Sequence, residues 1–159
     1  VGVKNLHPTE LSLLVDTRLN DSEYEELMLE EFTNAHCGYR NEKVFRRMYQ
    51  AWIARNDAMA QSIVNTLEAN PQNPVVMIVG FGHLRHGMGI PERVAYLHPA
   101  TKQINFTMFE ISQEPSSLDS YLPEFEINGK TFRQDFDYIW FTSRQDVEDP
   151  CKAFRKQFK

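Results

Sequence analysis

The pattern of apolar and polar residues predicts helices and strands arranged around one short apolar run. Val75–Val79 are consecutive apolar residues, with Pro74 before them and Gly80 and Gly82 after them. Such a run is typical of a strand that is buried on both faces. His83 follows immediately, and ligand-binding groups in open α/β sheets collect beyond the carboxyl ends of the strands. We therefore expect Val75–Val79 to be the central strand and His83 to lie at a binding site.

Two amphipathic patterns precede this run and predict helices over residues 21–38 and 41–70. Arg55 fills a gap in the inward stripe that we assign to the longer helix, so the pattern predicts a buried guanidinium. Burial of this charge requires a partner, either an acid such as Asp135 or Asp137, or an anionic ligand near His83. The assigned stripe consists of Val44, Met48, Trp52, Met59, Ile63 and Leu67.

The carboxyl-terminal part of the chain predicts shorter elements. We expect a helix over Pro91–Leu97, a strand within Gln103–Ile111, and a hairpin over Phe125–Phe132 that turns at its Asn-Gly pair. Asp137–Thr142 is expected to form the last strand. Together the patterns predict an α/β fold with a central, mostly parallel sheet flanked by helices. The long helix precedes the central strand, a carboxyl-terminal hairpin and strand follow it, and residues 1–159 form a single domain.

Composition restricts the classes of function. The chain has 159 residues, of which 42% are hydrophobic and 25% charged, which fits one globular domain. Its formal net charge of -5 argues against a general nucleic-acid binder, because phosphate neutralisation needs a basic face. A local basic cluster is interpreted as a solvated helix face or as a contact for carboxylate or phosphate. It consists of Arg40, Lys43, Arg46 and Arg47.

The chain contains two cysteines, Cys37 and Cys151, which are far apart and lack CxxC spacing. This spacing predicts neither a zinc knuckle nor a redox motif. A disulfide between them is compatible only with an oxidising compartment, and the sequence leaves the pairing open.

Three segments together resemble the ChaN-like haem-binding lipoproteins of bacterial iron uptake, within the wider Tiki, TraB and erythromycin-esterase-like superfamily. These segments are RNDAMA at residues 55–60, VVMIVGFGHLRHGMGIPERV at residues 75–94 and DYIWFT at residues 137–142. The likeness covers roughly residues 36–150. It implies that the chain corresponds to the carboxyl part of a longer family domain.

The resemblance implies a homodimer that holds two haems face to face, with each iron bound by a tyrosine of one subunit. Tyr39 is the first candidate for this axial ligand and Tyr49 the second, while Tyr96 and Tyr138 are weaker alternatives. Basic residues of the other subunit would then meet the haem propionates or line the pocket. The candidates for this role are His83, Arg85, His86, Arg55 and Lys43.

The same resemblance implies a non-enzymatic protein on the periplasmic side of the bacterial envelope. It also implies a lipid anchor in the full-length protein and an outer-membrane haem receptor as a partner. The alternative is a metal-dependent hydrolase of the Tiki or erythromycin-esterase kind. In that case His83 would bind metal or act as a general base, and Arg55 would stabilise an oxyanion. One histidine without a flanking carboxylate is a poor metal site, and Asn56 stands where the family commonly has an acid. A third possibility is a fragment whose pocket is incomplete.

Overall fold

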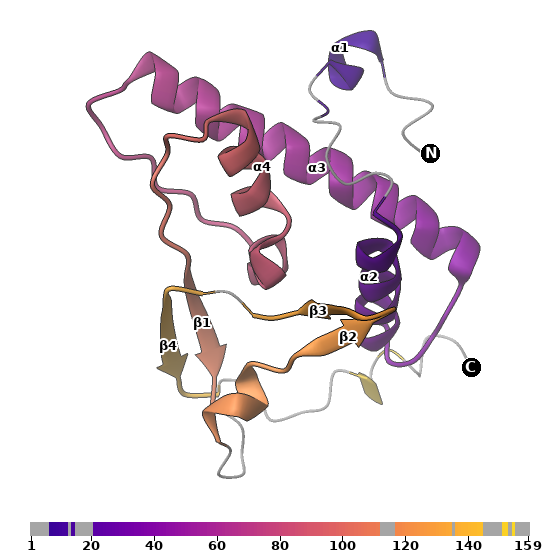
Figure 1. The fold of residues 1–159 in the computed structure, drawn as a ribbon. Helices are drawn as coiled ribbons and strands as arrows, with labels where there is room; N and C mark the ends of the chain where they lie inside the picture. Colours follow the sequence, from indigo (N-terminus) through magenta and orange to yellow (C-terminus); the bar gives the residue numbers. More distant parts are fainter. Residues whose placement is uncertain are drawn as a thin grey trace.

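The structure is a computed structural model that describes residues 7–12, 14, 21–111, 117–134, 136–144, 151, 152 and 154. Helices occupy the first part of the chain and strands the last part (Figure 1). The helices are α1 (Pro8–Leu11), α2 (Ser22–Ala35), α3 (Glu42–Ala69) and α4 (Ile90–Leu97). The strands are β1 (Phe106–Glu110), β2 (Phe125–Ile127), β3 (Lys130–Phe132) and β4 (Tyr138–Thr142). Short 3₁₀ turns occur at η2 (Phe81–His83), η3 (Arg85–Gly87) and η4 (Leu118–Tyr121).

The two main helices begin where their capping residues predict. The Asp21 side chain accepts a hydrogen bond from the Tyr24 N–H at 2.8 Å, and the Asn41 side chain accepts one from the Val44 N–H at 3.1 Å. These bonds satisfy backbone donors that the first turn of a helix leaves unpaired. The predicted helices over residues 21–38 and 41–70 are thereby confirmed as α2 and α3.

Helix α3 connects two hydrophobic clusters and runs along the whole molecule (Figure 1). Its first half packs against α2, and its second half packs against α4. The inward stripe predicted for this helix was wrong at Val44, which is 45% exposed, and at Arg55, which is also exposed. Four of its other residues are partly buried against the clusters, namely Met48, Trp52, Met59 and Ile63. The buried face starts one residue later, which rotates it by about 100°. It consists of Phe45, Tyr49, Ile53, Asn56, Asp57, Ala60 and Val64.

The four strands form two separate ladders. β1 and β4 pair in parallel, with Phe106 opposite Tyr138 and Met108 opposite Trp140. β2 and β3 form the predicted hairpin, and the Asn-Gly pair at its turn has positive φ at both residues, as a tight type I′ turn requires. Lys130 of this hairpin binds Asp21 at 3.0 Å, which ties β3 to the start of α2. These elements confirm the α/β class.

The segment that we expected to be the central strand is not a strand in the structure. Val75–Val79 lies between α3 and η2 without strand geometry, and Val76 and Ile78 are 85% and 96% exposed. Among the described residues, no backbone hydrogen bond links this run to a neighbouring strand. An apolar run becomes a strand only where a neighbour pairs with its N–H and C=O groups, and the described residues provide that pairing only within β1–β4 and β2–β3.

Candidate functional site

His83 lies in a small cluster built by helix α3 and the loop that contains η2. Trp52 and Asn56 are one helical turn apart on α3, so both reach the same side chain. The Asn56 Oδ1 atom is 2.5 Å from His83 Nδ1, and the indole ring of Trp52 stacks on the imidazole with a centroid distance of 4.0 Å. Asn56 is fully buried and His83 is partly buried. The cluster therefore holds the imidazole on one face and at one edge.

Two glycines allow the loop to approach α3 this closely. A Cβ atom at Gly82 would come 3.2 Å from the Trp52 ring, which is tighter than an ordinary contact. Gly89 has φ +75°, and a Cβ atom there would collide with the backbone carbonyl of His83. Glycine is the residue that adopts positive φ without steric cost. The glycines of this loop thus allow His83 to lie against α3.

A buried ion pair fixes the other end of the loop. Asp57 on α3 and Arg93 on α4 bind each other with both side chains fully buried. Arg93 also donates to the Gly89 carbonyl oxygen at 2.8 Å. Sequence reasoning missed this pair because the assigned stripe of α3 was displaced by one residue. With the observed stripe, Asp57 falls on the inward face, and an arginine on the facing helix is the partner that a buried carboxylate requires.

His83 is neutral at physiological pH. Burial and the nearby Arg55 guanidinium lower the pKa of its imidazole, because both disfavour the charged form. Nδ1 of the neutral ring shares a hydrogen bond with the side-chain amide of Asn56, whose Nδ2 atom is buried without a partner in the described structure. Within the described part of the chain, Nε2 has no hydrogen-bond partner.

Arg55 is exposed on α3 and makes no ion pair with any residue that the structure describes. Of its expected partners, Asp135 lies outside the described residues, and Asp137 accepts a hydrogen bond from the Asn105 backbone at 2.6 Å. Lys43 is likewise exposed and unpaired among the described residues. Both cations are therefore open to an anionic ligand.

Arg85 and His86 face inward, which does not favour the contact with a haem propionate that was predicted for them. Arg85 pairs with Glu31 of α2 and lies 5.1 Å from the centre of the Phe81 ring. The His86 side chain is 1% exposed, and burial followed by the Arg85 charge lowers its pKa to about 4. A neutral, enclosed imidazole and a paired guanidinium are poorly suited to bind a propionate. Their observed role is to attach the loop to α2.

The candidate tyrosines lie in very different surroundings. Tyr49 is 1% exposed in the core, and burial raises the pKa of its phenol, so phenolate formation and access to a ligand are both disfavoured. This burial argues against Tyr49 as an iron ligand. Tyr39 is 49% exposed in the turn between α2 and α3, and Tyr96 and Tyr138 are also exposed. Tyr39 is the exposed tyrosine next to the basic cluster at the start of α3.

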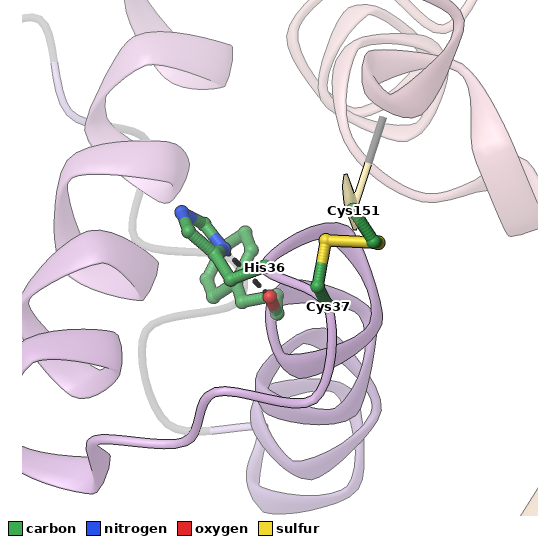
Figure 2. The surroundings of a disulfide bond; sticks show 4 residues. His36, Cys37 and Cys151 are labelled. Carbon is green, nitrogen blue, oxygen red and sulfur yellow. Dashed lines mark hydrogen bonds between the residues drawn. A yellow bond between two sulfur atoms is a disulfide. The ribbon is translucent and has the colours of Figure 1, made fainter. Parts of the chain in front are cut away.

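A disulfide lies next to this turn. Cys37 and Cys151 are bonded, with their Cα atoms 5.5 Å apart, and Figure 2 shows the bond where α2 ends. His36 hydrogen-bonds the Phe32 carbonyl oxygen at 2.7 Å, and its ring also contacts Phe154. The pairing that the sequence left open is thereby assigned. Disulfides of this kind persist in oxidising compartments.

Two features are absent from the part of the chain that the structure describes. None of the described helices is long and apolar enough to cross a bilayer. Nor do three or more His, Cys, Asp or Glu side chains of that part of the chain gather where they could hold a metal ion. The hydrolase alternative thus finds no ligand set in the described residues.

The comparisons with known proteins identify one family. A family model described as "Haem-binding uptake, Tiki superfamily, ChaN" matches residues 2–94. This range contains α2, α3, the glycine-rich loop and the first half of α4, and so it includes Tyr39, Arg55, Asn56, His83 and Arg93. No curated protein and no solved structure matches the chain.

Proposed function

Because this chain belongs to the ChaN family of haem-binding uptake proteins in the Tiki superfamily, we propose that it is a haem carrier that binds haem at the interface of two protomers. In this proposal Tyr39 of one protomer binds the ferric iron, and Arg55 of the other binds a propionate. The observation that carries it is the exposure of both side chains, which contrasts with the buried Tyr49 and with Arg85, whose guanidinium is paired with Glu31.

The surroundings of Tyr39 fit an iron-binding phenolate. The next residue, Arg40, and Lys43 are exposed and unpaired among the described residues. A phenolate is a known protein ligand of haem iron, and exposed cations beside it are suited to the carboxylates of the same ligand. Half-exposure leaves the ring accessible to a planar ligand, in contrast to the enclosed ring of Tyr49.

The length of α3 supports a shared site. Tyr39 precedes the helix, whose first residue is Glu42, and Arg55 lies on its middle. At 1.5 Å per residue, the axial distance from Glu42 to Arg55 is about 20 Å. A separation of this size favours contact with two different haems, so we propose a dimer with a two-fold axis in which each Tyr39 shares its haem with the partner's arginine.

We also propose the compartment in which the protein works and the partner that it meets there. The disulfide supports an oxidising environment, which fits the periplasmic side of a bacterial envelope. A lipid anchor in the full-length protein and an outer-membrane haem receptor belong to the proposal on the strength of the family resemblance. We propose a carrier rather than a hydrolase, because Asn56 replaces an acid beside His83 and no metal-ligand cluster occurs among the described residues.

A haemin titration of the purified chain, followed by visible absorption, tests this function. The wild type is expected to show saturable binding and a tyrosinate-ligated ferric spectrum. Tyr39→Phe is expected to weaken binding at least about tenfold, which corresponds to about 1.4 kcal/mol. Tyr96→Phe is the matched control, because it removes an exposed phenol elsewhere and should bind like the wild type.

The possible results distinguish the identity of the iron ligand from haem binding itself. Binding by Tyr39→Phe that equals the wild type would show that another residue holds the iron. The absence of saturable binding by the wild type would contradict haem carriage itself.

A further inference from the structure

We propose that the start of α4 is a binding site for a carboxylate, which accepts hydrogen bonds from Asn56 Nδ2 and Arg93 Nη2. The inference goes beyond the proposed function, because it requires neither Tyr39 nor Arg55. Its basis is a pair of buried donors that the described part of the chain leaves without acceptors. The carboxylate belongs either to a small molecule or to an acidic side chain of another polypeptide.

The two donors belong to fully buried side chains. Asn56 and Arg93 are each 0% exposed, and neither Asn56 Nδ2 nor Arg93 Nη2 has a hydrogen-bond partner among the described residues. The rest of the Arg93 guanidinium is satisfied, because it binds Asp57 and donates to the Gly89 carbonyl oxygen. Buried donors without acceptors are rare and unfavourable in folded proteins, so two of them in one place indicate a missing acceptor.

Both side chains meet at Gly89, the residue that precedes the first turn of α4. Asn56 Nδ2 is 3.5 Å from the point where a Cβ atom on Gly89 would lie, and Arg93 Nη1 is 2.8 Å from the Gly89 carbonyl oxygen. Within the described part of the chain, no side chain caps this end of the helix. The N–H groups of a first turn and the helix dipole favour a negative charge there. The unpaired donors and the helix end therefore point to the same acceptor.

The surrounding charges favour a carboxylate over a more highly charged anion. Asp57 already neutralises Arg93, and His83 is neutral beside the exposed cation of Arg55. The site thus offers several N–H donors but only a small excess of positive charge, which suits a monoanion better than a phosphate dianion. Donors from two separate groups also match the two oxygens of a carboxylate.

The donors are enclosed, so a ligand reaches them when the loop beside them moves. The part of the loop that contacts Asn56 is η2, which contains three residues. Its backbone is held by turn bonds, such as the one from the His83 N–H to the Gly80 carbonyl oxygen at 3.0 Å. Short 3₁₀ turns have few and poorly aligned hydrogen bonds, and such segments open more readily than helices.

A formate titration of the purified chain without haem, followed by NMR of side-chain N–H signals, tests the site. The signals of the Asn56 amide and the Arg93 guanidinium are expected to shift saturably, with a dissociation constant of about 10 mM or lower. Sodium chloride at the same ionic strength should leave both signals unchanged. This measurement needs no variant, so it does not depend on whether an altered chain folds.

A variant that supplies its own carboxylate gives a second test. Asn56→Asp places a negative charge beside Arg93, so formate should no longer shift the guanidinium signal. Asn65→Asp is the matched control, because it makes the same change at an exposed position of α3. It should respond to formate like the wild type. An undiminished formate response in Asn56→Asp would overturn the inference.

A second titration distinguishes the two sources of the carboxylate. Its probe is a short peptide with blocked ends and one glutamate, compared with the same peptide that contains glutamine instead. A saturable shift with the glutamate peptide alone would assign the site to an acidic side chain, and a shift with formate alone would assign it to a small molecule. The absence of any saturable shift, or equal shifts with chloride, would overturn the inference. Haem carriage would be unaffected by that result, because haemin is not used in these measurements.

Discussion

At the scale of single residues, two histidines three positions apart lie in different surroundings. His83 is partly exposed and held by a buried amide, whereas His86 is enclosed between α2 and the β2–β3 hairpin. His86 also adopts φ +62°, a conformation that non-glycine residues rarely adopt. Its Nε2 atom is buried without a hydrogen bond in the described structure and lies 4.0 Å from Glu31. Protonation of such a ring in the folded state is unfavourable.

The pKa of His86 predicts how stability depends on pH. The pKa is about 4 in the folded state and about 6.5 in the unfolded chain, so unfolding takes up a proton between these values. His86 therefore adds nothing to the pH dependence above pH 6.5, and stability falls as the pH drops from 6.5 toward 4. The expected loss is about 2 to 3 kcal/mol.

Urea unfolding of the wild type and of His86→Asn, compared between pH 7 and pH 4, measures this effect. Asparagine tolerates the positive φ and does not titrate in this range, so the variant should lose less stability on acidification. An equal loss in both proteins would show that His86 does not contribute.

The sequence predicted where the helices lie along the chain better than it predicted which of their residues face inward. The stripe assigned to α3 took Val44 as inward and placed Arg55 within it, whereas Phe45 and Tyr49 are inward and Arg55 is exposed. Apolar residues occupy both stripes, so periodicity alone does not choose between faces about 100° apart. The choice is made by α2 and α4, whose apolar faces pack against α3.

At the scale of elements, the turn between α2 and α3 contains an unusual cysteine. The Gly38 N–H bonds the Thr33 carbonyl oxygen at 2.9 Å, and the Cys37 N–H bonds that of Asn34 at 3.1 Å. This pattern is a Schellman motif, in which glycine is preferred at the first position after the cap. That position is Cys37, with φ +59°. The disulfide is the reason for a side chain there, since glycine has no sulfur to bond Cys151.

Variants at Cys37 should separate the stability lost with the disulfide from the strain of the positive φ at this residue. Its cysteines are 114 residues apart, so the bond restricts a long loop of the unfolded chain, and Cys37→Ser is expected to lose about 2 to 4 kcal/mol of unfolding free energy. Cys37→Gly should lose about 1 kcal/mol less than Cys37→Ser, because glycine relieves the positive φ. Urea unfolding under non-reducing conditions measures the differences.

Cys151→Ser is the control for the bond itself, and it should match Cys37→Ser. The double variant should be no less stable than either single variant. Equal stability of Cys37→Gly and Cys37→Ser would show that the backbone of this turn is not strained by the cysteine.

Elements with local signals were predicted well, and elements that need distant partners were not. Capping residues determine where α2 and α3 begin, and an Asn-Gly pair determines the hairpin, so both are readable from a few neighbouring residues. Val75–Val79 has the composition of a buried strand, yet a strand also requires a pairing neighbour. The sequence of the run does not reveal whether that neighbour is present.

At the scale of the whole molecule, one face of the β1–β4 ladder is exposed and apolar. Parallel sheets are normally covered on both faces, so this exposure is unusual for a pair of parallel strands. The residues share one face because side chains alternate along a strand and the register places them opposite each other. They are Phe106, Met108, Tyr138 and Trp140, each between 48% and 65% exposed.

The proposed haem site also belongs to this scale, because it is formed by two protomers. Tyr39 precedes α3 and Arg55 lies at its middle, and in the proposed site each protomer supplies one of these two residues to a shared haem. The sequence indicated both residues through the family resemblance. It did not indicate that one is beside a disulfide and the other exposed near a neutral imidazole, since these depend on contacts between distant segments.

Mixing two variants tests the shared site most directly. Tyr39→Phe and Arg55→Glu are each expected to bind little haem, because every site of each homodimer lacks one contact. In an equal mixture, about half of the dimers contain one chain of each kind, and each of these has one intact site and one doubly altered site. The account predicts about a quarter of the wild-type haem capacity in the mixture, at a haemin concentration where neither variant alone binds. A mixture that binds no more haem than the two separate variants would contradict a site formed by Tyr39 and Arg55 of different protomers.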